Sequence, residues 1–376
     1  LSLAYVGDVS EVWVQPPFSE ASYVVGEYNS THYYARNSST GEYEFLSADA
    51  STVIQAALDG LTVGRTWKEK VLLKGNFIID GPIKISAHTY FQLVGKITLA
   101  DNANCNMIEN AHQGTHDYDV TIDGGTLDGN MAHNTGSSSG IEWITTSYPS
   151  SLELIPVEIK NMRIRNFELN GVYIKNLVRL LLHHCTIRNI GAYGLYCDNV
   201  ADSEIYNLLP VDGSTAHEAV YMLDCTSNQL NTLYINNGMV LHGCKDISFS
   251  NGLFDSKLDE KDRHALTLTG TRFCVFHHFT FRVQGNNSIT DKDAILLTTT
   301  GGGDNHDNIF SNIYAGRREG TGTNRWRYAI EESDSNQNYN IYSNINGREP
   351  VLGALRRLGI NSTSDNDSIL GTIVTS

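Results

Sequence analysis

The chain has 376 residues, of which 18% are charged, and its formal net charge is −15. A chain this acidic is unsuited to holding nucleic acid or an anionic membrane as its main task, although local patches could still bind an anionic sugar polymer. Glycine (33 residues) and asparagine (34 residues) are abundant, which argues against a helical bundle or a doubly wound α/β fold. No apolar run reaches the ~18 residues that a membrane span needs.

The first predicted elements are a short β lead-in over 1–46 and a capping helix over 47–64. The helix would begin at Ser47 or Asp49, either of which is a good N-cap residue. Its apolar side chains fall on one face: Val53, Ile54, Ala57 and Leu58. A solenoid exposes the inner side of its first coil, and one amphipathic helix would cover that open end.

A five-residue motif recurs from about residue 140, with a small residue followed by alternating apolar positions. Examples are GVYIK (171–175), GLYCD (194–198), AVYML (219–223) and ALTLT (265–269). Between these segments lies a second motif with an asparagine, at Asn166, Asn189, Asn207, Asn251, Asn312 and Asn344. The intervals of about 19 to 35 residues favour stacked coils of a solenoid. The predicted fold is therefore all-β: a right-handed, single-stranded parallel β-helix of about ten coils over 65–350, with a C-terminal tail over 351–376.

Three segments carry a family resemblance: DASTVIQAALDG (49–60), KVLLKGNFIIDGPIKI (70–85) and IDGGTLDGN (122–130). They resemble the pectate-lyase-like superfamily of right-handed parallel β-helices, which includes polysaccharide hydrolases, polysaccharide lyases and phage tailspikes. The resemblance implies a carbohydrate-handling protein that is extracellular or sits on a virion or cell surface. The Asp pairs and Gly-His-Gly signature of polygalacturonases are absent, as is a calcium-dependent pectate lyase motif, so the resemblance selects no reaction.

Strand alternation places the second and fourth motif positions inside and the third and fifth outside. The third position then forms an exterior stripe of Tyr173, Tyr196 and Tyr221 in consecutive coils. Aromatic rings with polar tips suit a sugar-binding surface. Lys175 and Asp198, at the fifth position, would lie beside the stripe. Alternatively, a loop or a neighbouring subunit covers these rings, as in a homotrimer.

Glycosidic cleavage commonly uses two carboxylates. We find no two carboxylates at the same motif position of adjacent coils, so the sequence predicts no pair of facing catalytic carboxylates. Asp198 and Glu218 are the predicted acid and base, with His242 and His264 assisting. Further carboxylates that could approach Asp198 are Asp224 and, in one insertion, Asp259, Glu260 and Asp262.

A lyase would instead need a base and a cation that neutralises a uronate carboxylate. Lys175, Tyr196, Tyr221 and His242 could supply both. Because the acidic chain offers no strong attraction for a polyuronate, a glycoside hydrolase is the favoured prediction. The alternatives are a polysaccharide lyase and a glycan-binding adhesin or tailspike without catalysis.

Two long loops complete the predicted site. The loop over 316–328 would form a wall with Arg325, Trp326 and Arg327. These three residues and Asp293 are predicted to bind the substrate. The loop over 299–308 carries two Asp and one His, which could hold Ca²⁺, but the spacing matches no strong motif. The six cysteines form no CxxC pair and are expected to be mostly buried. The sequence thus predicts no metal site and no cofactor.

Overall fold

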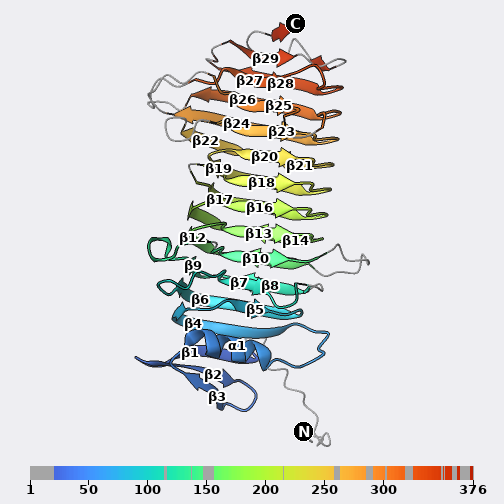
Figure 1. Ribbon diagram of the computed structural model, residues 1–376. Coiled ribbons are helices and arrows are strands. Elements are labelled where there is room, and N and C mark those ends of the chain that lie inside the picture. The colour runs from blue at the N-terminus through green and yellow to red at the C-terminus, as the bar shows by residue number, and fades with distance from the viewer. Residues whose placement is uncertain are drawn as a thin grey trace, which may run out of the picture.

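The computed structural model describes residues 21–113, 117–136, 138–146, 156–214, 216–257, 263–284, 291–300, 303–317, 325–348, 350, 352–357, 362–364 and 373–375. The chain winds into a tall stack of coils, with its first strands at one end and its last strands at the other (Figure 1). Strands of successive coils pair in parallel, in two long sheets. The prediction of a parallel β-helix is confirmed.

Within the described residues, the front sheet has 12 strands. Its members are β5 (Ile83–Ile85), β7 (Ile108–Asn110), β10 (Ile141–Ile144), β13 (Val172–Lys175), β16 (Leu195–Asp198), β18 (Val220–Leu223), β20 (Met239–His242), β23 (Leu266–Thr269), β25 (Ile295–Thr298), β27 (Tyr328–Glu332), β29 (Gly353–Arg357) and β31 (Ile373–Thr375). The predicted tail over 351–376 contributes β29 and β31, so the solenoid continues past residue 350.

The back sheet has 19 strands in the part of the chain that the structure describes. They are β1 (Tyr23–Asn29), β2 (His32–Asn37), β3 (Tyr43–Ser47), β4 (Glu69–Ile79), β6 (Thr89–Leu99), β8 (Val120–Asp123), β9 (Thr126–Asp128), β11 (Val157–Lys160), β12 (Arg163–Phe167), β14 (Leu180–His183), β15 (Thr186–Ile190), β17 (Glu204–Asp212), β19 (Gln229–Asn236), β21 (Ser248–Ser250), β22 (Leu253–Lys257), β24 (Val275–Gln284), β26 (Ile309–Arg317), β28 (Ile341–Gly347) and β30 (Thr363–Ser364). A short 3₁₀ helix spans Met131–His133.

Helix α1 (Ala50–Asp59) packs against the first strands at the N-terminal end of the stack (Figure 1). Its N-cap is Asp49, whose side chain accepts hydrogen bonds from the backbone N–H groups of Ser51 and Thr52. The four apolar residues predicted to share one face are all buried. The lead-in strands β1, β2 and β3 pair antiparallel, and β1 also pairs in parallel with β4. The lead-in is therefore continuous with the back sheet.

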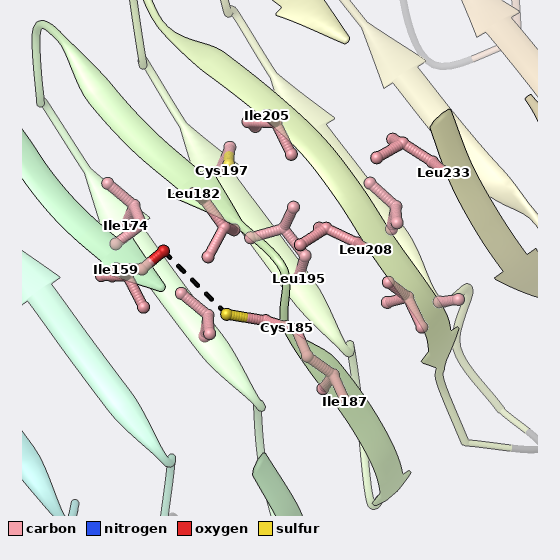
Figure 2. Close-up of a cluster of buried hydrophobic side chains, with 14 of the residues drawn as sticks. Ile159, Ile174, Leu182, Cys185, Ile187, Leu195, Cys197, Ile205, Leu208 and Leu233 are labelled. Carbon is pink, nitrogen blue, oxygen red and sulfur yellow. Dashed lines mark hydrogen bonds between the residues drawn. The ribbon is translucent and has the colours of Figure 1, made fainter. Parts of the chain in front are cut away.

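The core fills the space between the two sheets. Val172, Ile174, Leu195 and Cys197 are all inaccessible to solvent, as the alternation predicts. Figure 2 shows side chains of both sheets interdigitating there, with the Cys185 thiol directed at the backbone carbonyl of Ile159 at 3.9 Å. Five of the six cysteines are buried and none is in a disulfide. Within the described residues no helix is long and apolar enough to cross a membrane.

The corners of the coils depend on asparagine. Asn166 and Asn189 have φ values of 60° and 53°, in the left-handed region that asparagine tolerates. The side-chain amide of Asn189 donates a hydrogen bond to the side-chain oxygen Oδ1 of Asn166, one coil earlier, at 2.7 Å. Glycine is required at position 95, where two coils approach each other closely. Its φ is 141°, and a Cβ there would lie 1.9 Å from the Gly75 carbonyl oxygen.

Candidate active site on the front sheet

The outer face of the front sheet carries one continuous column of side chains. Each member is the in-register partner of the next, on strands about 4.8 Å apart. From the N-terminal end the column reads Lys84, Glu109, Glu142, Tyr173, Tyr196 and Tyr221. A cation, two carboxylates and three phenols thus follow one another along the stack.

The three tyrosines lie outside the core and are half-buried, as predicted. The rings of Tyr173 and Tyr196 stack, with centroids 4.9 Å apart and planes at 19°, whereas Tyr221 meets Tyr196 edge-on at 87°. Tyr193, on the preceding turn, contacts both Tyr196 and Tyr221. Because two ring faces cover each other, this part of the column offers ring edges and hydroxyl groups, rather than the flat faces expected from the sequence.

Burial, and then the charge of Asp198 and the neighbouring phenols, raise the pKa of Tyr196 to about 12. Burial is also the main reason why the pKa values of Tyr173 and Tyr221 are raised. All three phenols are therefore neutral near pH 7.

Lys175 and Asp198 lie beside the stripe, as expected, and form an ion pair with an Nζ–Oδ2 distance of 2.6 Å. The hydrogen bond to Asp198 is the main cause of the raised pKa of Lys175, which keeps this amine protonated. The pair can therefore hold polar groups of a ligand, but a lysine in this state is a poor base.

The predicted acid and base, Asp198 and Glu218, do not form a dyad. Glu218 pairs with Arg263 at 3.2 Å, whereas Asp198 pairs with Lys175. Each carboxylate is thus bound to a different cation. Turn residues such as Glu218 precede the strand, where the alternation no longer fixes the direction of a side chain.

The two predicted histidines also lie apart from each other. His242 lies next to the stripe, with Nδ1 3.5 Å from the Tyr221 hydroxyl. His264 lies near the C-terminal coils, where its Nδ1 accepts the backbone N–H of Asp293 at 2.9 Å. His242 can therefore reach a ligand on the stripe, whereas His264 belongs to a second cluster.

In that cluster, formed by His264, Asp293, Arg327, Glu331 and Arg356, the two carboxylates are buried and the other three side chains are half-buried. Asp293 is inaccessible to solvent, and both of its oxygens bind the Arg327 guanidinium, at 3.1 and 2.7 Å. Glu331 is 2% exposed and contacts Arg327 and Arg356. The prediction that Asp293 contacts substrate is corrected, because its buried carboxylate needs a partner and binds Arg327. Arg327 itself is half-buried, and its contact with substrate stays a prediction.

Trp326 is a second correction. Its side chain is 2% exposed and belongs to the hydrophobic core, so it cannot form the predicted stacking wall. Arg325 beside it is half-buried. Trp326 lies two residues before β27, where the chain enters the core after the long loop. Most of that loop, residues 318–324, is outside the described residues, as are Asp259, Glu260 and Asp262.

Glu109 and Glu142 were missed by the sequence analysis, which expected no carboxylates in one column of adjacent coils. They are in-register partners on β7 and β10, and both are half-buried. The Asn106 amide donates to Glu109 at 3.0 Å. Burial, and then the Glu109 carboxylate, raise the pKa of Glu142. A signal existed: Glu142 occupies the third position of the GIEWI motif (140–144), one coil before Tyr173.

In the part of the chain that the structure describes, no three His, Cys, Asp or Glu side chains gather as a metal site would require. In the loop considered for Ca²⁺, His306 pairs with Asp307 at 2.7 Å, and residues 301–302 lie outside the description.

The same coil architecture is found in solved structures. The A-module of the mannuronan C-5 epimerase AlgE6 from Azotobacter vinelandii has a TM-score of 0.58 and 14% identity, over 87% of this chain and 95% of that one. The chain has the right-handed parallel β-helix fold. This β-helix also resembles the AlgE4 A-module of the same bacterium, with a TM-score of 0.50 and 16% identity, over 85% and 96% of the two chains. The enzymatically active domain of tailspike protein 2 from bacteriophage CBA120 has a TM-score of 0.35 and 15% identity, over 79% and 41%. The sequence matches no family model and no curated protein.

Proposed function

We propose that this β-helix is a polysaccharide-cleaving enzyme, a glycoside hydrolase whose substrate lies along the outer column of the front sheet. The observation that carries the proposal is the pair of in-register carboxylates, Glu109 and Glu142, at the end of the tyrosine stripe. Two carboxyl groups with different protonation states are what glycosidic hydrolysis requires.

The two carboxyl groups have distinct environments. Glu142 has a raised pKa and retains its proton to a higher pH than an ordinary glutamate. Glu109 accepts a hydrogen bond from Asn106 and lies in register between Glu142 and Lys84. We therefore assign Glu142 as the general acid and Glu109 as the carboxylate that acts on the anomeric carbon.

The reaction follows from these roles. Glu142 gives its proton to the glycosidic oxygen as the bond from that oxygen to the anomeric carbon breaks, and a Glu109 oxygen bonds to the anomeric carbon. Water then displaces Glu109, and Glu142 takes up the proton of that water. Strands about 4.8 Å apart favour the separation of ~5–5.5 Å found in retaining enzymes over the ~6.5–9.5 Å of inverting ones.

The substrate class is supported by the stripe and by the similar structures. Phenol hydroxyls, the Lys175–Asp198 ion pair and His242 form a polar, partly aromatic row beside the acid pair. Such a row suits a chain of sugar hydroxyls. Mannuronan C-5 epimerases, which share the fold, act on a polysaccharide, as their name states.

A polysaccharide lyase is less well supported. A tyrosine base must lose its proton, and the raised pKa of Tyr196, about 12, opposes this near neutral pH. A glycan-binding protein without catalysis would use the same stripe, but would have no need of the paired Glu109 and Glu142 carboxyl groups. An extracellular, virion or cell-surface location and a homotrimeric assembly stay predictions from the sequence.

Incubation with a panel of neutral and acidic polysaccharides tests the proposal. Reducing ends are measured together with absorbance near 235 nm, which detects the unsaturated product of a lyase. We expect new reducing ends without absorbance, and loss of this activity in Glu142→Gln. Absorbance at 235 nm would establish a lyase instead, and glycan binding without product would leave only the binding function.

A further inference from the structure

The back sheet carries a cluster of arginines far from the column just described. Arg163 and Arg165 on β12 and Arg188 on β15 line a cavity of about 390 Å³. Thr186, Leu209 and Pro210 complete much of its wall. All three arginines are exposed. A concentration of positive charge is unexpected on a chain whose net charge is −15.

The register of the coils forces two of these charges together. Arg165 pairs in register with Asp128 on one side and with Arg188 on the other. Opposite charges in directly paired positions stabilise a sheet, and like charges destabilise it. The pairing of Arg165 with Arg188 thus destabilises the sheet unless an anion lies between or over the two guanidinium groups.

The neighbouring carboxylates do not neutralise the cluster. Asp128 binds Arg165, with its Oδ2 3.1 Å from Nε and 3.0 Å from Nη2. Among the described residues, Arg188 pairs only with Asp212, at 4.0 Å, and this carboxylate also accepts a hydrogen bond from Asn236 at 2.6 Å. Within the described residues, the Arg163 guanidinium has no ion pair or hydrogen bond. The positive charge of Arg163 and most of that of Arg188 therefore remain available to bind an anion.

We propose that this cavity, the arginine pocket, binds a phosphate or sulfate group. Guanidinium groups present planar pairs of N–H donors that match the oxygens of such tetrahedral anions. Arg163 and Arg188 hold the anion from adjacent coils, and Leu209 and Pro210 offer an apolar wall to whatever carbon body carries it. The site lies on the opposite sheet from the proposed catalytic column, so it stands or falls independently of the proposed function.

Isothermal titration calorimetry at low ionic strength tests the pocket, with inorganic phosphate and inorganic sulfate titrated separately. We expect saturable binding at one site for at least one of the two anions. The anion that binds more tightly indicates whether the natural ligand carries a phosphate or a sulfate group. Arg163→Ala and Arg188→Ala should each raise the Kd about tenfold, as loss of one charge-assisted contact predicts.

Arg282→Ala is the matched control, because Arg282 lies on β24 of the same sheet, next to the in-register Asp255, but outside the pocket. It should bind the anions as the unchanged protein does. A second readout separates binding from folding: without anion, Arg188→Gln should keep or raise the Tm, since it removes the repulsion from Arg165. Binding of neither anion, equal weakening by Arg282→Ala, or a clear fall in the Tm of anion-free Arg188→Gln would overturn the proposal.

Discussion

Glu142 lies directly across from Glu109 on the neighbouring strand of the front sheet, and the proximity of the two carboxylates helps to raise the pKa of Glu142. Two negative charges in paired positions repel each other, and protonation of one removes the repulsion. Burial and the nearby Glu109 carboxylate both favour the protonated form of Glu142. In the proposed mechanism, this relationship lets Glu142 act as the acid and Glu109 as the nucleophilic carboxylate.

Replacing Glu142 with Gln should lower kcat at least about 100-fold, because general acid catalysis contributes that much or more. Activity of the unchanged enzyme should fall as the pH rises through the raised pKa of Glu142, since only the protonated form donates. Steady-state rates across pH on a cleaved glycan check both expectations.

Glu204→Gln is the control for this prediction, because Glu204 is an exposed glutamate on β17 of the back sheet. It should keep full activity and the same pH profile. An active Glu142→Gln enzyme would remove Glu142 from the mechanism, whatever the outcome for Glu109.

Tyr196→Ala should weaken glycan binding about tenfold, because it removes both the hydroxyl and the ring that supports Tyr173 and Tyr221. Tyr196→Phe keeps the ring packing and should cost less than Tyr196→Ala. Affinity electrophoresis or calorimetry with the cleaved glycan measures the difference. Equal binding by all three proteins would place the substrate elsewhere.

Trp326→Ala should destabilise the fold by about 3–5 kcal/mol, the usual cost of emptying a large buried aromatic site. Chemical denaturation gives this free energy of unfolding. The remaining folded protein should bind glycan normally, because the ring is in the core. Normal stability combined with weak glycan binding would instead support the substrate wall that the sequence suggested.

Glu331 should make stability depend on pH near neutrality. Burial, and then Asp293, raise its pKa to about 7, well above that of a glutamate in the unfolded chain. The folded state thus holds this proton more tightly than the unfolded chain does. The stability that protonated Glu331 adds to the fold is therefore fully present below about pH 4.5 and is lost as the pH rises through about 7. The Tm of the unchanged protein should fall more between about pH 5 and 8 than that of Glu331→Gln.

Glu158→Gln provides the opposite case. Hydrogen bonds from Lys160 and His183 outweigh burial and lower the pKa of Glu158. Its ionised form stabilises the fold above the pKa of the glutamate in the unfolded chain, so Glu158→Gln should lower the Tm near pH 7.

The Glu331 prediction has its own contradicting outcome. If the Tm of the unchanged protein and that of Glu331→Gln fall in parallel as the pH rises, Glu331 titrates alike in the folded and unfolded states.

Much of the fold could be predicted from local patterns. Alternation of apolar residues identified the strands of the front sheet and their inner side, and small or asparagine residues marked the corners. These patterns depend on neighbours along the chain, and a strand turns each successive side chain to the opposite face wherever it lies. The tyrosine stripe and the Lys175–Asp198 neighbourhood follow from the same rule and are found in the structure.

The acid pair was beyond this reasoning. Glu109 lies on a strand of only three residues, before the region in which the repeat is regular. The segments between strands vary in length, so the sequence does not reveal which residue of one coil lies beside which residue of the next. Backbone pairing across the coils made Glu109 the neighbour of Glu142.

The sequence by itself determined that the chain coils, which residues of each strand face inward, and that three phenols share one outer column. The tertiary structure was needed to show that Asp293 and Trp326 are buried, that Glu109 lies beside Glu142, and that three arginines line one pocket on the other sheet. The physical reason is one of range. Alternation acts between adjacent residues, whereas burial at a turn and charge pairing between coils depend on segments that are distant in the chain.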